Sequence, residues 1–436
     1  MMKKRMVLLS LSLAACIGLV AGCGGNAENN ATTGSSGESN ASTSSGNAVE
    51  INFQNIWVGA DSKAEVFNQM IEGFNTEFDG KYKIVVEEQT DYDMYRDKLR
   101  TQISTGDAPD IFTVGSYADL ELFSQSGKLM DLTEFLENDD MKSQFVSGSV
   151  DAAKVDGKNY GFPYENAVVP IMYNQKLLTE AGVEELPQSF EEFFDVCEKL
   201  KAIDVYPTAQ MTADNAFTSM LWYSYALAAC GGPDIYEKGF DDPAFVEAAD
   251  LIKRMYDYTA PDAVGGDATV VNGHFFNERT GIYTNGSWIL GRIKTEGVEG
   301  LYDNLVLAPG LSYNGENGGA YINQVQAYFC AGAQTDPAKE EGIKEFFKYI
   351  CDKERVTELA NSSGALFLID IDSTQLTDPV QAELAKQSSE ATFTIGHFQG
   401  SVPTTVANAF PAALESLVLG DVDSQGFVDM LKEANE

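Results

Sequence analysis

Histidine is almost absent from this chain, which has only His274 and His397 in 436 residues and neither of them in an HExxH pattern. The sequence also lacks a GxSxG elbow, a Walker-type phosphate loop and a GxGxxG between a strand and a helix. These absences argue against histidine-driven catalysis, nucleotide hydrolysis and dinucleotide chemistry. We therefore expect no catalytic residues and no cofactor.

Basic residues are also scarce, because 29 Lys and Arg face 66 Asp and Glu, for a formal net charge of −37. Such a surface repels nucleic acid and anionic lipid, so neither is expected as a partner. Three acidic pairs do not follow an EF-hand loop and are more typical of caps and turns than of a metal site: Asp91/Asp93, Asp139/Asp140 and Asp370/Asp372. Two carboxylates that cleave a glycoside need only be close in space, so a hydrolase stays open.

Cysteine is sparse, with six residues in all and four in the main body: Cys197, Cys230, Cys330 and Cys351. Their spacing fits neither a CxxC motif nor a metal site. A body of this size needs no disulfide staples, so buried free thiols are favoured over disulfides.

The N-terminus has the order read by secretion machinery. Lys3-Lys4-Arg5 precedes an apolar run from Met6 to Leu19, which is shorter than the roughly 20 residues of a membrane-spanning helix. Residues 1–22 are predicted to be a signal peptide. Ala21-Gly22-Cys23 resembles the lipobox of bacterial lipoproteins, so we expect Cys23 to be acylated and to hold the protein at the outer face of the bacterial cytoplasmic membrane. The alternative is an ordinary secretory signal with an incidental cysteine.

A low-complexity segment follows. Residues 23–48 consist largely of Gly, Asn, Ala, Ser and Thr, without aromatic or basic residues, which predicts a disordered tether with a span of about 25–30 Å. The body from Val49 onward exceeds the size at which single cores usually stop growing, so we expect two domains.

Strand and helix patterns alternate along the body. Period-two alternation or short apolar runs predict strands over Glu50–Ile56, Lys81–Glu88 and Ile111–Val114. Helical spacing and start signals predict helices over Lys63–Phe78, Tyr92–Thr105 (closed by Gly106), the segment after Ser189, Ala244–Tyr258 and Pro337–Ile350. This alternation indicates α/β layers with ligand crevices at strand ends.

Longer blocks match one family in order and spacing. They are Ser104–Phe112 (STGDAPDIF), Gly127–Phe135 (GKLMDLTEF), Asp156–Pro163 (DGKNYGFP), Met172–Leu177 (MYNQKL), Ala181-Gly182, Pro187–Phe194, Phe276–Ile282 (FNERTGI), Asn285–Trp288 (NGSW) and Gly318–Ala320. As a set they resemble the extracellular solute-binding proteins of ABC importers, in the sugar-binding group that includes maltose-binding protein. The stretch after Gly364 matches less.

The resemblance implies a two-lobe α/β fold of the periplasmic-binding-protein type II class, with a hinge and a ligand cleft between the lobes. We expect residues 49–163 with 308–355 in the N-terminal lobe and 164–307 with 356–436 in the C-terminal lobe. Crossings are expected near residues 162–166, 307–310 and 352–362. The ligand closes the hinge by contacting both lobes at once. The protein is expected to be a monomer.

A sugar offers apolar C–H faces and a ring of hydroxyls, so its site calls for aromatic platforms beside carboxylates and amides. By resemblance, all three tryptophans fall where the family contacts ligand. The full candidate set is Trp57, Asp61, Asp110, Ser116, Tyr117, Tyr164, Glu165, Asn166, Trp222, Tyr223, Trp288, Gly319, Tyr321 and Asn323. Three alternatives stay open: Trp222 in ordinary packing, Glu165 as a salt-bridge partner at the hinge, and Asp110 in shaping a turn.

The expected function is that of a lipid-anchored receptor that captures a sugar or oligosaccharide and delivers it to an ABC permease. One alternative is an exported hydrolase or adhesin that acts on glycans. The other is a receptor of the same fold for an amino acid, polyamine, iron or phosphate. A hydrolase would shorten its sugar, whereas a receptor would return it unchanged.

Overall fold

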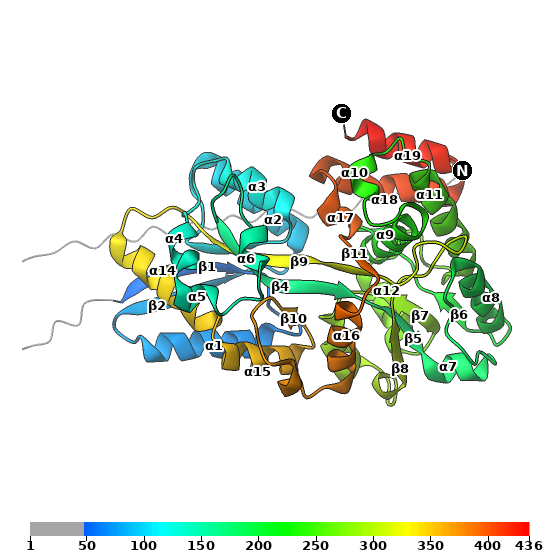
Figure 1. Ribbon diagram of the computed structural model, residues 1–436, viewed down its shortest axis with the longest axis horizontal. Helices are drawn as coiled ribbons and strands as arrows, with labels where there is room; N and C mark the ends of the chain where they lie inside the picture. The colour runs from blue at the N-terminus through cyan, green and yellow to red at the C-terminus, as the bar shows by residue number, and fades with distance from the viewer. Residues whose placement is uncertain (1–47, 436) are drawn as a thin grey trace, which may run out of the picture. The chain divides into compact units, whose positions relative to one another are not determined.

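The computed structural model describes residues 48–435, so the expected signal peptide, Cys23 and the expected tether up to residue 47 lie outside the described residues. Figure 1 shows helices arranged around strands in two parts of this body. Within residues 48–435, no helix is both long enough and apolar enough to cross a lipid bilayer.

The first sheet has the strand order β10-β4-β9-β3-β1-β2, and β11 pairs with β9 beside this path. Strand β1 runs parallel to β2 and β3, whereas β9 is antiparallel to both β3 and β4. The bounds are β1 Val49–Asn55, β2 Tyr82–Glu88, β3 Ile111–Val114, β4 Gly161–Val169, β9 Ala320–Ala331, β10 Leu366–Phe367 and β11 Phe393–Ile395. Strands β1, β2 and β3 are therefore parallel neighbours, and the chain between them passes through helices.

The second sheet is smaller and has the order β6-β7-β5-β8. Its strands are β5 Ile171–Asn174, β6 Tyr206–Thr208, β7 Thr280–Thr284 and β8 Leu305–Ala308. We call the part built on β1–β3 the N-terminal lobe and the part built on β5–β8 the C-terminal lobe.

Helices pack on both sheets (Figure 1). In the N-terminal lobe they are α1 Ala64–Glu77, α2 Tyr92–Thr105, α3 Tyr117–Ser124, α4 Thr133–Glu137, α5 Asp139–Lys142, α6 Ser149–Ala152, α14 Pro337–Ile350 and α15 Lys353–Ser363. In and beside the C-terminal lobe they are α7 Gln175–Glu180, α8 Phe190–Lys201, α9 Phe217–Gly231, α10 Ile235–Lys238, α11 Ala244–Met255, α12 Ala268–Phe276, α13 Ile289–Glu296, α16 Pro379–Ser389, α17 Phe398–Ser401, α18 Thr404–Leu419 and α19 Ser424–Glu433, with 3-10 turns at Tyr256–Tyr258, Tyr302–Asn304 and Ser373–Gln375.

The elements expected from the sequence are all present, and local chemistry explains their ends. Gly106 ends α2 in the left-handed region at φ 86°, which costs glycine no steric strain. The Ser189 hydroxyl accepts from the Glu192 N–H and caps α8. The Glu192 carboxylate reaches one residue further back than a capping box requires and accepts from the Gln188 N–H.

Two strands connect the lobes. On β4, Phe162 packs in the core of the N-terminal lobe and Val169 in that of the C-terminal lobe. On β9, Phe329 and Ile322 are divided in the same way. The pairing of β4 with β9 shifts register on both sides of Glu165, so the ladder is irregular at the point where the chain passes between the cores.

The second and third passages both lie later than expected. Ala308 and Leu311 still pack in the core of the C-terminal lobe, so the crossing expected near residues 307–310 occurs instead along β9. Val356 and Leu359 on α15, and then Phe367 and Ile369, pack in the core of the N-terminal lobe. The expected division after residue 355 therefore differs from the observed packing. The reason is that the apolar face of α15 is buried against this core, a tertiary contact that position along the chain does not reveal.

The four cysteines of the body are free thiols, as predicted. Cys197, Cys330 and Cys351 are buried, and burial raises the pKa of each thiol. A thiol whose pKa is raised carries little thiolate and reacts slowly, so these residues act as small apolar core groups.

Candidate functional site

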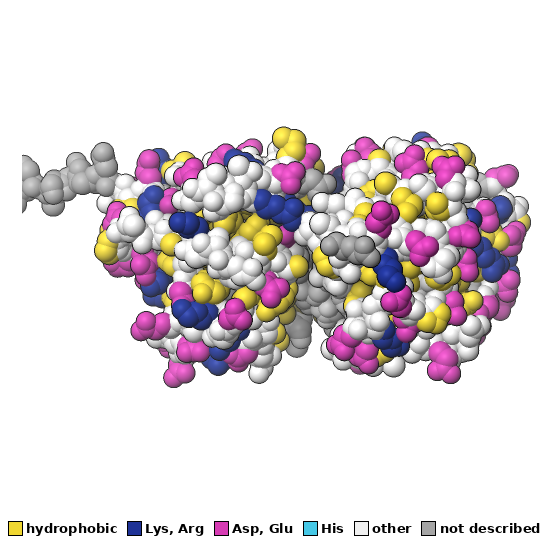
Figure 2. Space-filling model, turned by 90° about the horizontal axis from the view of Figure 1, so that it is seen from above, with side chains coloured by type: hydrophobic (Ala, Val, Ile, Leu, Met, Phe, Trp, Pro, Cys, Tyr) yellow, Lys and Arg dark blue, Asp and Glu magenta, His cyan; other side chains and the backbone are white. Residues whose placement is uncertain are grey.

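A cleft of about 470 Å³ lies between the lobes and is lined by residues of both. Figure 2 shows a furrow separating the two lobes on one face of the molecule. The N-terminal lobe contributes the loop from β1 to α1 and the approach to α2, and the C-terminal lobe contributes the starts of α9, α12 and α13. Glu165 of β4 and Gln326 of β9 line the cleft from the connecting strands.

The lining combines aromatic rings with side-chain amides. The rings belong to Trp57, Tyr92, Phe217 and Trp288. The amides belong to Gln89, Asn215, Asn272, Asn285, Gln326 and Gln399. Four charged residues, Asp61, Lys63, Glu165 and Arg292, complete the polar part of the wall. Amides both donate and accept hydrogen bonds, so this wall suits a neutral ligand with many hydroxyls.

Trp57 is anchored in the N-terminal lobe. Its side chain is 2% exposed and lies edge-on to Phe67 and Phe329, with ring centroids 4.8 and 5.6 Å away. The side chain of Asn55 brackets its backbone, accepting from the Trp57 N–H at 3.0 Å and donating to the Trp57 carbonyl at 3.2 Å. Core packing therefore holds this residue at the cleft wall.

Trp288 is more open and lies opposite the loop that begins α1. Its ring is half-buried and tilted against Phe217, with centroids 6.2 Å apart. The Ser62 hydroxyl donates to the Trp288 carbonyl at 3.0 Å, a hydrogen bond that joins the two lobes at the cleft. Trp288 and Phe217 together give the C-terminal lobe an aromatic wall.

A buried ionic cluster lies at the junction of cleft and hinge. Lys63 Nζ lies 3.0 Å from a Glu165 oxygen and 3.3 Å from an Asp61 oxygen, and it stands over the Trp57 ring at 5.2 Å. Burial raises the pKa of Glu165 against the attraction of Lys63. Burial alone would lower the pKa of Lys63, but the attraction of Glu165 and Asp61 outweighs it and raises that pKa. The open alternative for Glu165, a salt bridge at the hinge, is thus present in the structure.

The remaining cation is also paired. Arg292 on α13 donates to the Glu296 carboxylate through Nε at 2.7 Å and Nη2 at 2.9 Å. The two hydrogen bonds to Glu296 raise the pKa of Arg292, and their effect is larger than that of burial, which lowers it. Both cations of the cleft are therefore neutralised by carboxylates of the chain itself.

Of the residues predicted for the site, four line this cleft: Trp57, Asp61, Glu165 and Trp288. The others are engaged elsewhere. Asp110 accepts from the Asn52 N–H and from Lys339, Tyr321 donates to Gln387, and Asn323 donates to Ser388.

The aromatic pair on α9 lies in the core of the C-terminal lobe. Trp222 is buried with its ring 5.3 Å from Phe193, and the Tyr223 hydroxyl donates to the Phe245 carbonyl at 3.1 Å. The open alternative for Trp222, ordinary packing, is thus its observed environment.

The last five predicted residues serve the backbone framework. The Tyr164 hydroxyl donates to the Ile350 carbonyl at 2.6 Å, and Asn166 lies in the β4–β9 ladder. Ser116 caps α3, the Tyr117 hydroxyl donates to the Lys154 carbonyl, and Gly319 turns at φ 81°. None of these five is among the residues that line the cleft.

None of the six amides that line the cleft was predicted from the sequence, and neither were two of its aromatic residues, Tyr92 and Phe217. Tyr92 begins α2 after β2, and Phe217 begins α9, so both stand where a loop meets a helix. That position was the available signal, because side chains at element ends reach crevices. Asn285 follows the end of β7 and carried the same signal, whereas Asn272 lies inside α12 and carried none. The Tyr283 hydroxyl donates to Asn272 and accepts from Asn285, and so holds both amides at the cleft.

His397 lies behind the aromatic wall, with its ring centroid 5.7 Å from that of Phe217. Burial lowers the pKa of His397 to about 3. Its Nδ1 accepts from the Gly400 N–H, and its Nε2 faces the Gln324 amide nitrogen. A second proton on the ring would add a charge in a buried place and would put a hydrogen on Nδ1, against the Gly400 N–H that already points at it.

This histidine is expected to make the fold acid-sensitive. The unfolded chain takes up the proton near pH 6.5 and the folded chain does not, so stability falls below that pH by up to about 1.4 kcal/mol per pH unit. Urea unfolding between about pH 7 and pH 5 measures the slope. His397→Asn, which keeps an acceptor for Gly400, should flatten it; the same slope in both proteins would contradict this assignment.

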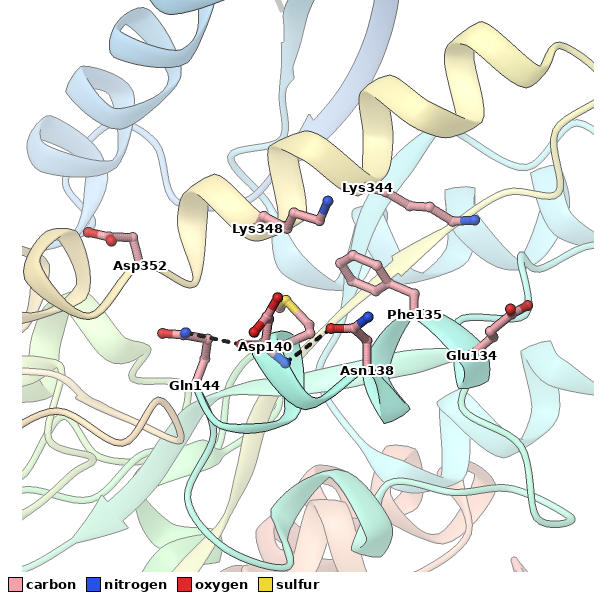
Figure 3. A pocket seen from close by; sticks show the side chains of 9 residues that line it. Glu134, Phe135, Asn138, Asp140, Gln144, Lys344, Lys348 and Asp352 are labelled. Atoms are coloured by element: carbon pink, nitrogen blue, oxygen red, sulfur yellow. Dashed lines mark hydrogen bonds between the residues drawn. The ribbon is translucent and has the colours of Figure 1, made fainter.

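A separate surface pocket of about 620 Å³ lies on the N-terminal lobe, between α14 on one side and α4 and α5 on the other. Figure 3 shows Lys344 and Lys348 on one side and Glu134, Asp140 and Gln144 on the other. Both lysines are paired on their own helix, with Glu340 at 2.6 Å and Glu345 at 2.9 Å. The residues that line this pocket all belong to the N-terminal lobe, so a ligand bound there would gain no contacts when the lobes close.

Comparison with known proteins places this geometry in a family. Residues 69–386 match the family described as bacterial extracellular solute-binding protein. Among curated proteins, the diacetylchitobiose binding protein DasA of Streptomyces coelicolor is 22% identical over 381 residues, covering 83% of this chain and 82% of the relative.

Solved structures agree on the fold. A chitin oligosaccharide binding protein has a TM-score of 0.81 at 20% identity, covering 89% of this chain and 98% of that chain. A protein studied for xylan utilization by Caldanaerobius polysaccharolyticus has a TM-score of 0.79 at 21% identity, covering 88% and 99%. The expected two-lobe fold is confirmed, and with most of its length matched, the chain belongs to the bacterial extracellular solute-binding proteins, a family of binding proteins and not of enzymes.

Proposed function

We propose that the protein is a receptor for a neutral sugar or oligosaccharide, which binds in the interlobe cleft and is delivered to an ABC permease. The observation that carries this proposal is the lining of the cleft, in which four aromatic residues stand among six side-chain amides. Aromatic faces pack on sugar C–H groups, and amides match hydroxyls as donors and acceptors.

The charges of the cleft support a neutral ligand. Lys63 is held by Glu165 and Asp61, and Arg292 is held by Glu296. An anionic ligand would have to replace these internal partners, whereas a hydroxyl can accept or donate without breaking them. The names of the relatives, which bind diacetylchitobiose and chitin oligosaccharide, point to the same class of ligand.

We further propose that acylation of Cys23 holds this monomeric receptor at the outer face of the cytoplasmic membrane. Support comes from the signal-like order of residues 1–22 and the small residues before the cysteine. The low-complexity segment that follows the cysteine would then be the tether between the lipid anchor and the folded body.

A thermal-shift screen of the full chain against mono- and oligosaccharides tests the ligand class, with amino acids and polyamines as controls. A sugar at about 100 times its dissociation constant should stabilise the protein by roughly 2.7 kcal/mol. The sugar should be recovered unchanged. A response to the control solutes alone would refute the sugar assignment and leave the fold as it stands.

Trp288→Ala is expected to weaken sugar binding by about 1–3 kcal/mol, because the half-buried ring offers a face to the cleft. Calorimetric titration measures the change. Leu419→Ala, on an exposed side chain of α18, serves as the matched control and should leave the affinity unchanged. Equal affinity in wild type and Trp288→Ala would remove this ring from the binding surface.

A further inference from the structure

Besides the cleft, a shallower groove also lies between the two lobes. It has a volume of about 510 Å³ and is lined by α3 of the N-terminal lobe and by the segment from α17 into α18. Its residues are Tyr117, Ala118, Glu121, Leu122, Gln125 and Gly400 through Thr404. Because both lobes line it, a ligand in it would favour the closed arrangement, as a ligand in the cleft would.

Tyr117 gives this groove a fixed aromatic surface. The side chain is 38% exposed, and its hydroxyl donates to the Lys154 carbonyl at 2.8 Å, which holds the ring in place. The neighbouring Leu122 is 51% exposed, with the polar Glu121 and Gln125 beside it. A ring that is already held loses little conformational freedom on binding, so this arrangement suits stacking on a sugar.

The walls of the groove continue those of the cleft. On the N-terminal lobe, Tyr92 lines the cleft, and its hydroxyl packs so closely on Gly115 that a Cβ there would lie 1.8 Å away. Tyr117 follows two residues later. On the C-terminal lobe, Gln399 lines the cleft and the next residue, Gly400, lines the groove. On each lobe, the wall of the groove therefore adjoins the wall of the cleft.

We propose that the groove extends the cleft and binds the outer units of an oligosaccharide, with Tyr117 stacking on one of them. This inference rests on the proposed function and adds ligand length to it. Short sugars would fill the cleft alone, and longer ones would gain contacts to α3 and α17. The protein should therefore bind a long oligosaccharide more tightly than the two-unit sugar of the same series.

The test compares ligand lengths on the full chain. Two-unit and five-unit members of the malto-, xylo- and N-acetylchito-oligosaccharide series are titrated into wild type, Tyr117→Ala, Tyr117→Phe and Met94→Ala. Tyr117→Phe keeps the ring, and Met94 is 71% exposed on α2 and lines neither hollow. Tyr117→Ala should weaken binding of the five-unit sugar by about five- to tenfold and leave the two-unit sugar unchanged. Met94→Ala should bind both lengths as wild type does, and Tyr117→Phe, which keeps the ring and loses only the hydroxyl bond to Lys154, should keep most of the affinity for the five-unit sugar.

The possible results distinguish a failure of the groove extension from a failure of the proposed sugar-binding function. If wild type binds both lengths equally, or Tyr117→Ala weakens both equally or neither, the extension is wrong while sugar binding stands. If no sugar of any length binds wild type, the proposed function fails and the extension fails with it. Thermal melting of each variant shows that any loss of affinity occurs in a folded protein.

Discussion

Trp57→Ala is expected to lower the free energy of unfolding by about 3–5 kcal/mol, the range for a large aromatic side chain removed from a core. The ring is 2% exposed and contacts Phe67, Phe329 and Tyr164 within 6 Å between centroids. Removing it leaves a cavity that these rings, themselves locked in the N-terminal core, cannot close. Urea unfolding should show a lower midpoint.

The contrast with Trp288 sharpens this prediction. Trp288 is half-buried at the cleft, so Trp288→Ala should act mainly on affinity and Trp57→Ala mainly on stability. Trp57→Phe, which keeps an aromatic ring, should recover most of the stability lost in the alanine variant. An unchanged urea midpoint in Trp57→Ala would mean that the ring contributes little to the core.

Lys63→Met is expected to cost about 3–5 kcal/mol, because it leaves the buried Glu165 carboxylate without its cation. Lys63 and Glu165 side chains are 3% and 2% exposed, so water cannot replace the missing charge. Lys63→Met should be measured by urea unfolding, with Lys81→Met as the matched control. Lys81 pairs with Glu341 on the surface, where both side chains are more than half exposed, and its loss should cost under about 1 kcal/mol.

The pH dependence gives this prediction a second readout. Burial already raises the pKa of Glu165, and without Lys63 it should rise further. The folded state then holds a proton that the unfolded chain releases near its ordinary pKa, so the damage should grow as pH rises. Adding Glu165→Gln should restore part of the stability and remove this slope. A loss in Lys63→Met that does not change with pH would argue against a buried, unpaired carboxylate.

The same ion pair connects stability to the hinge. Lys63 stands at the start of α1, and Glu165 lies on β4 where its pairing with β9 shifts register. The pair therefore fixes the irregular part of the connecting strand against the first helix. A ligand in the cleft lies against this pair, because both residues line it.

Local signals in the sequence predicted the framework well. Helical spacing and Gly106 fixed both ends of α2, and Asp336 with Pro337 marked the start of α14, because capping and backbone restrictions act over a few residues. The longer blocks indicated the family, and the matched span of residues 69–386 confirms it.

The site was predicted only in part, and the failures share a cause. Trp222 lies within α9 after Met220 and Leu221, and is buried, whereas Trp288 follows Asn285-Gly-Ser at the start of α13 and borders the cleft. The apolar neighbours of Trp222 kept ordinary packing open for that residue, but they did not decide it. Whether a side chain meets the core or the cleft depends on which face of its helix packs against the sheet.

Composition and short-range patterns were enough to indicate the family, the acidic composition and the elements named above, and they favoured free thiols over disulfides. The partners that converge on the cleft come from distant parts of the chain and depend on the folded arrangement. Lys63 and Glu165 are 102 residues apart and Ser62 and Trp288 are 226 apart. Such contacts exist only once β4 and β9 have carried the chain between two cores, so no local pattern records them.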